Sequence, residues 1–298
     1  MGIDPLLSDP DNGDFSLLPD SPAWGYGCQT FPDRIDKKYH LDRKHYIINN
    51  NRKLSRSIIE VGGLISENTV WDADTVLVTD NVTVDHGINL MIVPGAKIIF
   101  NGYFRIEVLG SLIAEGEPEN KIVFDSSSPE LYSPDSTQVG CWNGIRFNNT
   151  SSVNDSSRIV YCVIQHSKSV SLNEPGGALS FYNFSKVKLE NCSIEKNYAA
   201  YGGAVACYYN ANPLITGNLF TQNTALWSGS VLFSAYSYPQ WRNNTIIDNN
   251  ILIDDIFWST GAMHNHLSKP LFQNNIIRGN STPYFEQLQL WQNKNFYT

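Results

Sequence analysis

The sequence predicts an all-β fold, a parallel β-helix of about eight or nine stacked coils that begins near residue 58. Three observations predict it. An internal repeat aligns residues 197–205 with residues 223–231, a shift of 26 residues without a gap. Apolar residues alternate in short runs, which is the period of a strand, and turn-forming Gly, Asn, Pro and Ser bound these runs. No window shows a sustained helical stripe, so short strands joined by turns are expected throughout.

The first recurring element is a glycine pair followed by a short apolar strand. It occurs at 176–179 and 202–205, and 260–263 continues the series after a longer step. A unit of 26 residues has room for three short strands and three turns, but it cannot bury its apolar face alone. Stacking the units pairs each strand in parallel with its equivalent in the next coil.

The second recurring element starts at a proline and carries asparagine five and ten residues later. Residues 213–223, 239–249 and 270–280 are clear copies, and 188–197 and 158–167 are weaker ones. In each copy an apolar residue follows seven positions after the proline or its equivalent, and Ile164 takes that place in the weakest copy. We expect these apolar residues to form one inward column of the core.

In-register stacking also predicts two columns of asparagine. A side-chain amide both donates and accepts, so each Asn can bond to the Asn above and the Asn below it. We therefore interpret these residues as structural and not as ligands. The first column contains Asn218, Asn244 and Asn275, preceded by Cys162 and Cys192, and the second contains Asn223, Asn249 and Asn280.

Composition excludes several classes of function. The net charge is −8 with 17% charged residues, which argues against a nucleic-acid partner. The five cysteines are spread out without a CxxC pair, so we expect buried thiols and no zinc site, and no metal or other cofactor is expected. The chain begins without the pattern of a signal peptide and has no apolar stretch of membrane-spanning length, so no membrane insertion by this segment is expected.

The paired motifs Gly-Gly-Ala-Val at 202–205 and Phe-x-x-Asn at 220–223 resemble the repeats of polymorphic outer-membrane proteins. Residues 90–100, 108–116 and 142–147 are similar to the opening coils of large secreted bacterial right-handed β-helix proteins. The resemblance covers roughly residues 58 to 298 and implies a right-handed, pectin-lyase-like β-helix. It also implies a secreted or cell-surface protein, often an adhesin, so we expect an extracellular or cell-surface location as part of a longer exported protein.

The resemblance also divides the chain. Residues 1–24 look like the closing segment of a preceding β-helix module, and residues 25–57 are expected to be a linker. The linker is rich in basic residues, and a binding patch for an acidic partner is the alternative interpretation. Residues 58–298 form the β-helix, which we expect to be truncated at its C-terminus because no capping segment is evident there.

Aromatic residues suggest a binding face rather than a catalytic site. Tyr182 and Tyr208 are equivalent in the repeat and are expected to point outward, because their neighbours Leu179-x-Phe181 and Val205-x-Cys207 point inward. A 26-residue shift also relates two further aromatic residues, and a third falls at the corresponding bend one coil on: Tyr201, Trp227 and Trp258. They could form a ladder that stabilises the sheet, or a platform for a surface glycan or partner protein.

A catalytic site is the alternative hypothesis. Asp254 and Asp255 are adjacent in the enlarged loop, close in sequence to Asp248 and His264, and they resemble the paired Asp and His of polygalacturonases. The Gly-His-Gly and Arg-x-Lys motifs of those enzymes are missing. The sequence therefore favours a non-catalytic module over a polysaccharide lyase or glycoside hydrolase, and a passive spacer is a third possibility.

Overall fold

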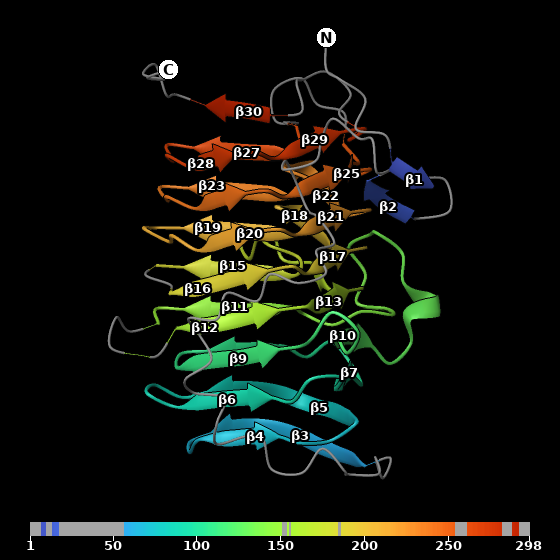
Figure 1. The fold of residues 1–298 in the computed structure, drawn as a ribbon, viewed down its shortest axis with the longest axis vertical. Helices are drawn as coiled ribbons and strands as arrows, with labels where there is room; N and C mark the ends of the chain where they lie inside the picture. The colour runs from blue at the N-terminus through green and yellow to red at the C-terminus, as the bar shows by residue number, and fades with distance from the viewer. Residues whose placement is uncertain are drawn as a thin grey trace.

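The computed structural model describes residues 57–150, 154, 156–183, 186–253 and 261–281. It also gives the backbone course of three further strands, β1 (Leu7–Asp9), β2 (Asp14–Leu17) and β30 (Leu288–Trp291). From residue 57 onward the chain winds into coils stacked along one axis, in sequence order from blue to red in Figure 1. The predicted parallel β-helix is confirmed, because apart from the β1–β2 pair the named strands pair in parallel with strands of adjacent coils.

Each regular coil contributes one strand to each of three walls. The first wall, which we call the β8–β27 arm, consists of β8 (Ile106–Val108), β11 (Ile145–Asn148), β15 (Leu179–Tyr182), β19 (Val205–Tyr208), β23 (Leu232–Ala235) and β27 (Met263–His266). The second wall, the β7–β29 arm, consists of β7 (Lys97–Phe100), β10 (Ile122–Ser126), β13 (Cys162–Gln165), β17 (Ser193–Glu195), β21 (Leu219–Thr221), β25 (Thr245–Ile247) and β29 (Ile276–Arg278). The long strand β5 (Thr75–Val84) belongs to both arms and also pairs with β3 (Ile58–Ile65).

The third wall is a separate eight-stranded sheet, one strand per coil, which agrees with the predicted number of coils. It consists of β4 (Thr69–Trp71), β6 (Asn89–Ile92), β9 (Ser111–Glu115), β12 (Ser157–Val160), β16 (Val187–Glu190), β20 (Leu214–Thr216), β24 (Gln240–Arg242) and β28 (Leu271–Gln273). A short four-stranded sheet fills one corner with β14 (Lys168–Ser169), β18 (Tyr198–Tyr201), β22 (Thr224–Ser228) and β26 (Asn250–Ile251).

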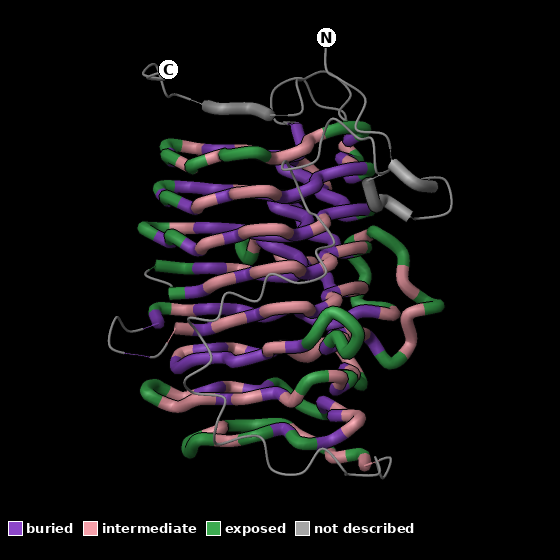
Figure 2. Tube along the Cα trace, in the orientation of Figure 1, coloured by how far each residue is buried: buried purple, intermediate pink, exposed green. Residues whose placement is uncertain are grey.

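The core is a continuous apolar column enclosed by the walls. The predicted inward residues stack in register, with Ile164 opposite Ile194, Ile194 opposite Phe220 and Phe220 opposite Ile246. All four side chains are buried. Figure 2 shows the resulting alternation of buried and partly exposed positions along each coil, with exposed residues gathered at the corners. The hydrophobic effect thus stabilises the stack as a whole, because a single coil would expose its apolar residues to water at both open ends.

Both predicted asparagine columns are present. Asn218 Nδ2 lies 3.0 Å from Asn244 Oδ1, and Asn244 Nδ2 lies 2.9 Å from Asn275 Oδ1. Cysteine continues this column, since the backbone N–H of Cys192 donates to Asn218 Oδ1 and that of Cys162 donates to Cys192 Sγ. Both thiols are free and buried, as predicted. The second column is longer than predicted and runs through Asn197, Asn223, Asn249 and Asn280.

The glycine pairs have a steric origin. Gly176, Gly202 and Gly229 have φ values of 87°, 64° and 62°, a region that residues with a Cβ atom rarely adopt. The second glycine of the pair is needed for a different reason, because a Cβ on Gly203 would lie 2.4 Å from the carbonyl oxygen of Ser230 in the next coil. The motif therefore marks a corner where adjacent backbones approach closely.

The ungapped 26-residue alignment is wrong at one corner. Tyr201 pairs with Ser228 rather than Trp227. The preceding pair is Ala199 with Ala225, so β22 has one more residue than β18 between the two pairs. The next strand keeps this shift, with Val205 opposite Leu232. The bulge aligns Gly229, which has a positive φ, with Gly202. The 26-residue alignment placed Ser228 at that position instead. The predicted equivalence of Tyr201 and Trp227 is therefore wrong.

A long excursion between β10 and β11 packs over the four-stranded corner. It contains the short 3₁₀ helix η4 (Pro129–Leu131), drawn in green beside β10 in Figure 1. The fully buried Lys168 anchors it: Lys168 Nζ lies 2.9 Å from Asp135 Oδ1, 3.0 Å from the Thr137 carbonyl oxygen and 5.0 Å from the centre of the Tyr132 ring. One buried cation thus fixes the excursion at several points.

Candidate functional site

The β8–β27 arm carries a row of polar and aromatic side chains on its outer surface. In β11, Ile145 and Phe147 belong to the core, so the alternation of a strand directs Arg146 and Asn148 outward. The pairing register then places Arg146 beside Glu107 of β8 and Ser180 of β15. It also lines up Asn148, Tyr182 and Tyr208 across three coils. The predicted equivalence of Tyr182 and Tyr208 is confirmed.

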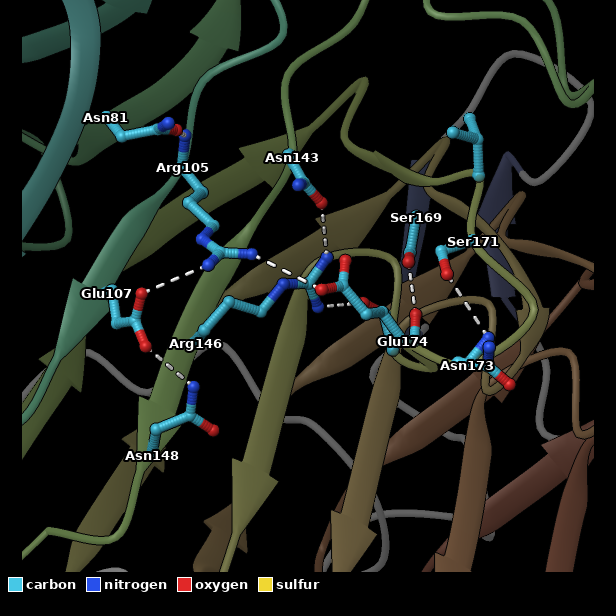
Figure 3. Close-up of polar contacts among 12 residues, drawn as sticks. Asn81, Arg105, Glu107, Asn143, Arg146, Asn148, Ser169, Ser171, Asn173 and Glu174 are labelled. Carbon is cyan, nitrogen blue, oxygen red and sulfur yellow. Dashed lines mark hydrogen bonds and ion pairs between the residues drawn. The ribbon is translucent and has the colours of Figure 1, made fainter.

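A cavity of about 340 Å³ lies over this part of the arm. The segment between β14 and β15 forms one side of it with Asn173, Glu174 and Pro175. Figure 3 shows how Arg105, Arg146 and Glu174 converge there from different coils. The lining residues are Arg105, Arg146, Asn148, Asn173, Glu174, Pro175, Ser180, Tyr182, Tyr208 and Tyr209. The volume is at the lower end of the range typical of small-ligand sites.

The two carboxylates near the cavity are both held by one cation. Arg105 lies 3.1 Å from Glu107 and 3.5 Å from Glu174, and Glu107 also accepts a hydrogen bond of 2.9 Å from Asn148 Nδ2. Hydrolysis of a glycosidic bond requires one protonated and one ionised carboxyl group facing the bond from opposite sides. Here both carboxylates bind the same arginine, and Glu107 is not part of the cavity lining, so the cavity does not present two carboxyl groups that face each other.

Arg146 is the most unusual group of the site. It is only 5% exposed, because the segment that follows β14 covers its outward-pointing side chain. Its guanidinium donates to the Gly176 carbonyl oxygen and, over 2.9 Å, to Asn143 Oδ1, both of which are neutral acceptors. Its Nε is buried and has no hydrogen-bond partner among the described residues. Burial lowers the pKa of Arg146 to about 10, so the group still carries its charge at neutral pH.

Tyr208 provides a second unsatisfied polar group in the same cavity. Its hydroxyl is buried and finds no partner in the described part of the chain. Burial is the main cause that raises the pKa of Tyr208 well above its usual value, so the hydroxyl stays neutral and can both donate and accept. Buried polar groups are nearly always hydrogen-bonded in folded proteins. The described residues hold nine buried side-chain atoms without a partner, and two of them, Arg146 Nε and the Tyr208 hydroxyl, belong to residues that line this cavity.

A strip of aromatic rings continues from the cavity along the corner that follows the arm. Tyr182 meets Tyr209 edge to face at 5.4 Å, and Tyr209 stacks on Tyr236 at 5.9 Å with an interplanar angle of 4°. Tyr236 in turn contacts His266. Tyr209 and Tyr236 form a ladder between coils, and both remain partly exposed, at 50% and 45%. Tyr182, at 40% exposure, lies at the boundary between this strip and the cavity.

The remaining predicted aromatic residues lie apart from the cavity lining. Tyr201 is half-buried and packs against Phe233, with 5.3 Å between ring centres. Trp227 is also half-buried and lies in β22 at the register shift. Trp258 lies outside the described residues. Of the five predicted binding residues, the structure thus places Tyr182 and Tyr208 together in one cavity.

The residues of the catalytic hypothesis are not brought together where the structure describes them. Asp248 is exposed at the turn after β25, in the β7–β29 arm, whereas His264 lies on β27 in the β8–β27 arm. His264 Nδ1 contacts the hydroxyl of Ser228, and burial, with a smaller effect of His266, lowers the pKa of His264 to about 4. Asp254 and Asp255 lie outside the described residues.

Sequence reasoning missed Arg105, Arg146, Tyr209 and Tyr236. The period of β11 indicates that Arg146 points outward, but an outward arginine normally reaches solvent. Its burial depends on the longer step from β11 to β15, where Leu179 follows Ile145 by 34 residues and the extra chain folds over the sheet. The repeat does not predict the position of these extra residues, because they lie outside the repeating unit.

Two other kinds of feature are not found among the described residues. No cluster of three or more His, Cys, Asp or Glu side chains within the described ranges is arranged to hold a metal ion. No helix in that part of the chain is long and apolar enough to cross a membrane.

The comparisons with known proteins bear on the fold. A family model described as "Right handed beta helix region" matches residues 135–297, which is more than half of the chain. No curated protein and no solved structure matches the sequence. The matched region includes β11, β15 and β19, which carry Arg146, Tyr182 and Tyr208.

Proposed function

Because this chain belongs to the right-handed β-helix family, we propose that it is a non-catalytic module of a secreted or cell-surface protein that binds a glycan on its β8–β27 arm. The observation that carries the proposal is the cavity lined by Arg146 and Tyr208, whose buried Nε and hydroxyl have no partner among the described residues. A ligand that supplies hydrogen-bond acceptors and hydroxyl groups would satisfy both.

The surroundings of the cavity favour a sugar over a flat protein surface. Asn148, Ser180 and Tyr182 line it with an amide, a hydroxyl and a partly exposed ring. Sugars combine apolar ring faces with many hydroxyl groups, and such a lining can contact both. A protein partner would need a much larger contact area than this cavity provides, on the order of 800 Å² from each side.

The charges of the site favour binding over catalysis. Glu107 and Glu174 both bind Arg105, and Glu174 alone of the two lines the cavity, so the site does not present the pair of facing carboxyl groups that glycosidic bond cleavage requires. The second candidate function is a carbohydrate-active enzyme. The observation in its favour is the pKa of Arg146, which burial lowers to about 10 and so brings closer to the range of a general base.

A glycan array followed by calorimetry tests the proposal. We expect the protein to bind at least one class of glycan, and Tyr182→Ala to weaken that binding about tenfold or more. Tyr238→Ala is the matched control, since Tyr238 is similarly exposed at 49% but is not part of the cavity lining. Equal losses from both variants, or no binding to any glycan, would contradict the proposal.

An activity screen separates the two candidate functions. The protein is incubated with polysaccharides, including uronate polymers, with and without calcium, and new reducing or unsaturated ends are measured. We expect no turnover. Product formation that disappears in Arg146→Met or Asp255→Asn would establish the enzyme instead.

A further inference from the structure

We propose that the glycan bound in the cavity carries a neutral N-acetylated amino sugar, and that Arg146 and Tyr208 donate hydrogen bonds to the carbonyl oxygen of its acetamido group. This inference rests on the proposed function and deepens it, because it names the chemical class of the sugar and the group that is recognised. It follows from the charge balance of the cavity, from two donors without an acceptor, and from the apolar part of the lining.

The charges at the cavity balance one another, which favours a neutral ligand. Arg105 binds both Glu107 and Glu174, at 3.1 and 3.5 Å (Figure 3). Together with Arg146 the cluster holds two arginines and two carboxylates, so no net charge is left for a ligand to neutralise. An anion would be repelled by Glu174 and a cation by Arg146, since both residues line the cavity. A neutral sugar avoids both repulsions.

Two donors in this balanced setting lack an acceptor. The contacts of Arg146 to Gly176 and Asn143 use its Nη atoms, and its buried Nε has no partner among the described residues. The buried hydroxyl of Tyr208 has none there either. Burial raises the pKa of Tyr208, and the charge of Arg146 opposes that rise, which shows that the two side chains lie near each other. One oxygen with two lone pairs can accept from both.

An amide group fits this arrangement better than a hydroxyl group does. Its carbonyl oxygen accepts two hydrogen bonds and carries no proton of its own, whereas a hydroxyl oxygen must also direct its hydrogen to an acceptor. The N–H of the amide needs an acceptor as well, and the side chains of Asn148 and Glu174 in the lining can provide one. An acetamido group is therefore complementary to the donors and the acceptors of this cavity.

The apolar part of the lining suits the methyl group of the same substituent. Pro175, Tyr182 and Tyr209 contribute three rings to the cavity. A methyl group packed against such rings is removed from water, which favours binding. A sugar with a hydroxyl group at this position would lack that contact.

Calorimetric titration with matched sugars tests the inference. Tri-N-acetylchitotriose is compared with cellotriose, and methyl N-acetylgalactosaminide with methyl galactoside, because the members of each pair differ only in acetamido against hydroxyl groups. In at least one pair we expect the acetamido sugar to bind about tenfold more tightly or better. The corresponding deacetylated amino sugar should lose this advantage, since it lacks the carbonyl and carries a positive charge. A short oligouronate should bind more weakly than the acetamido sugar.

Tyr208→Phe separates a role in binding from a role in folding. Because the hydroxyl has no partner within the described fold, its removal takes away no hydrogen bond that stabilises the protein. We expect the unfolding midpoint of the parent and a loss of about threefold to tenfold in affinity for the acetamido sugar. Tyr238→Phe, at an exposed position outside the cavity lining, is the control and should leave that affinity unchanged. Arg146→Met should abolish the preference for acetamido over hydroxyl.

The outcomes distinguish this inference from the proposed function. Equal affinities within both pairs, or an unchanged affinity for the acetamido sugar in Tyr208→Phe, would overturn the acetamido site but leave a glycan-binding module. Stronger binding of the oligouronate, or an array in which the bound glycans lack acetamido groups, would have the same consequence. Binding of none of the probes, together with an empty glycan array, would overturn the proposed function itself.

Discussion

Asn218 and Asn244 lie one above the other in adjacent coils, and the Nδ2 atom of Asn218 donates to Oδ1 of Asn244 over 3.0 Å. The same Nδ2 also donates to the Leu189 carbonyl oxygen, and Oδ1 of Asn218 accepts from the backbone N–H of Cys192. Each amide therefore satisfies backbone groups at a corner where strand pairing is interrupted. The column joins the coils through side chains where the sheets cannot do so.

Removing one member of this column should weaken the whole solenoid. In Asn218→Ala, the Leu189 carbonyl oxygen and the Cys192 N–H lose their side-chain partner, while Asn244 Oδ1 keeps the bond from the backbone N–H of residue 218, and we expect a loss of about 2–4 kcal/mol in the free energy of unfolding. Asn218→Cys should cost less, because Cys192 already fills the equivalent place one coil earlier. Urea unfolding followed by circular dichroism measures both. Asn212→Ala, at an exposed position, is the control and should change stability by less than about 0.5 kcal/mol.

The two ends of the Lys168–Asp135 pair should respond unequally to mutation. Lys168 is fully buried, whereas the Asp135 side chain is 45% exposed. Asp135→Asn leaves a buried ammonium without its carboxylate, and we expect a loss of about 2–4 kcal/mol. Lys168→Met replaces the cation by an apolar chain of similar volume and leaves an aspartate that water can solvate, so the loss should be smaller.

Thermal unfolding of these two variants gives the order of the two losses. Glu130→Gln, an exposed acid in the same excursion, is the control for the removal of a negative charge. A larger loss in Lys168→Met than in Asp135→Asn would contradict the buried-cation interpretation of this anchor.

Stability should fall in mild acid because of His264. Burial lowers the pKa of His264 to about 4, whereas the unfolded chain titrates near 6.5, so between these values the unfolded state binds more protons. The contribution of the neutral His264 is complete above about pH 6.5 and is lost as the pH falls toward 4, by up to about 3 kcal/mol in all. Urea midpoints between pH 8 and pH 4.5 measure this slope. His264→Asn should flatten the slope and His266→Asn should largely keep it; the same slope in His264→Asn as in the parent would refute the assignment.

Leu267 is a position where substitution should stabilise the protein. It follows β27 at a corner where φ is 48°, and the equivalent corners of earlier coils hold Asn149, Asn183, Tyr209 and Tyr236 with φ values of 48°, 60°, 47° and 52°. Leucine is strained there, whereas asparagine and glycine adopt this region readily. We expect Leu267→Gly to raise the free energy of unfolding by about 0.5–1 kcal/mol. Leu271→Gly is the control, with a similar exposure of 41% but a place within β28, and it should destabilise.

The sequence by itself determined the architecture of this protein, since the spacing of Asn218, Asn244 and Asn275 predicts both the stacked coils and the amide column that joins them. A repeat predicts the architecture because equivalent residues pack in the same way in each coil. It also predicted the outward alignment of Tyr182 with Tyr208.

Only the tertiary structure decided where the repeat is broken and what the breaks produce. The register shift beside Trp227 follows from the need for glycine at a positive-φ corner, which no apolar pattern records. The burial of Arg146 depends on a segment between β14 and β15 that lies outside the repeat and folds over the sheet. Regular spacing in the sequence predicts the strands and turns that successive coils share. The cavity instead arises from contacts that occur in one coil, and these contacts depend on the path of the inserted segment in space.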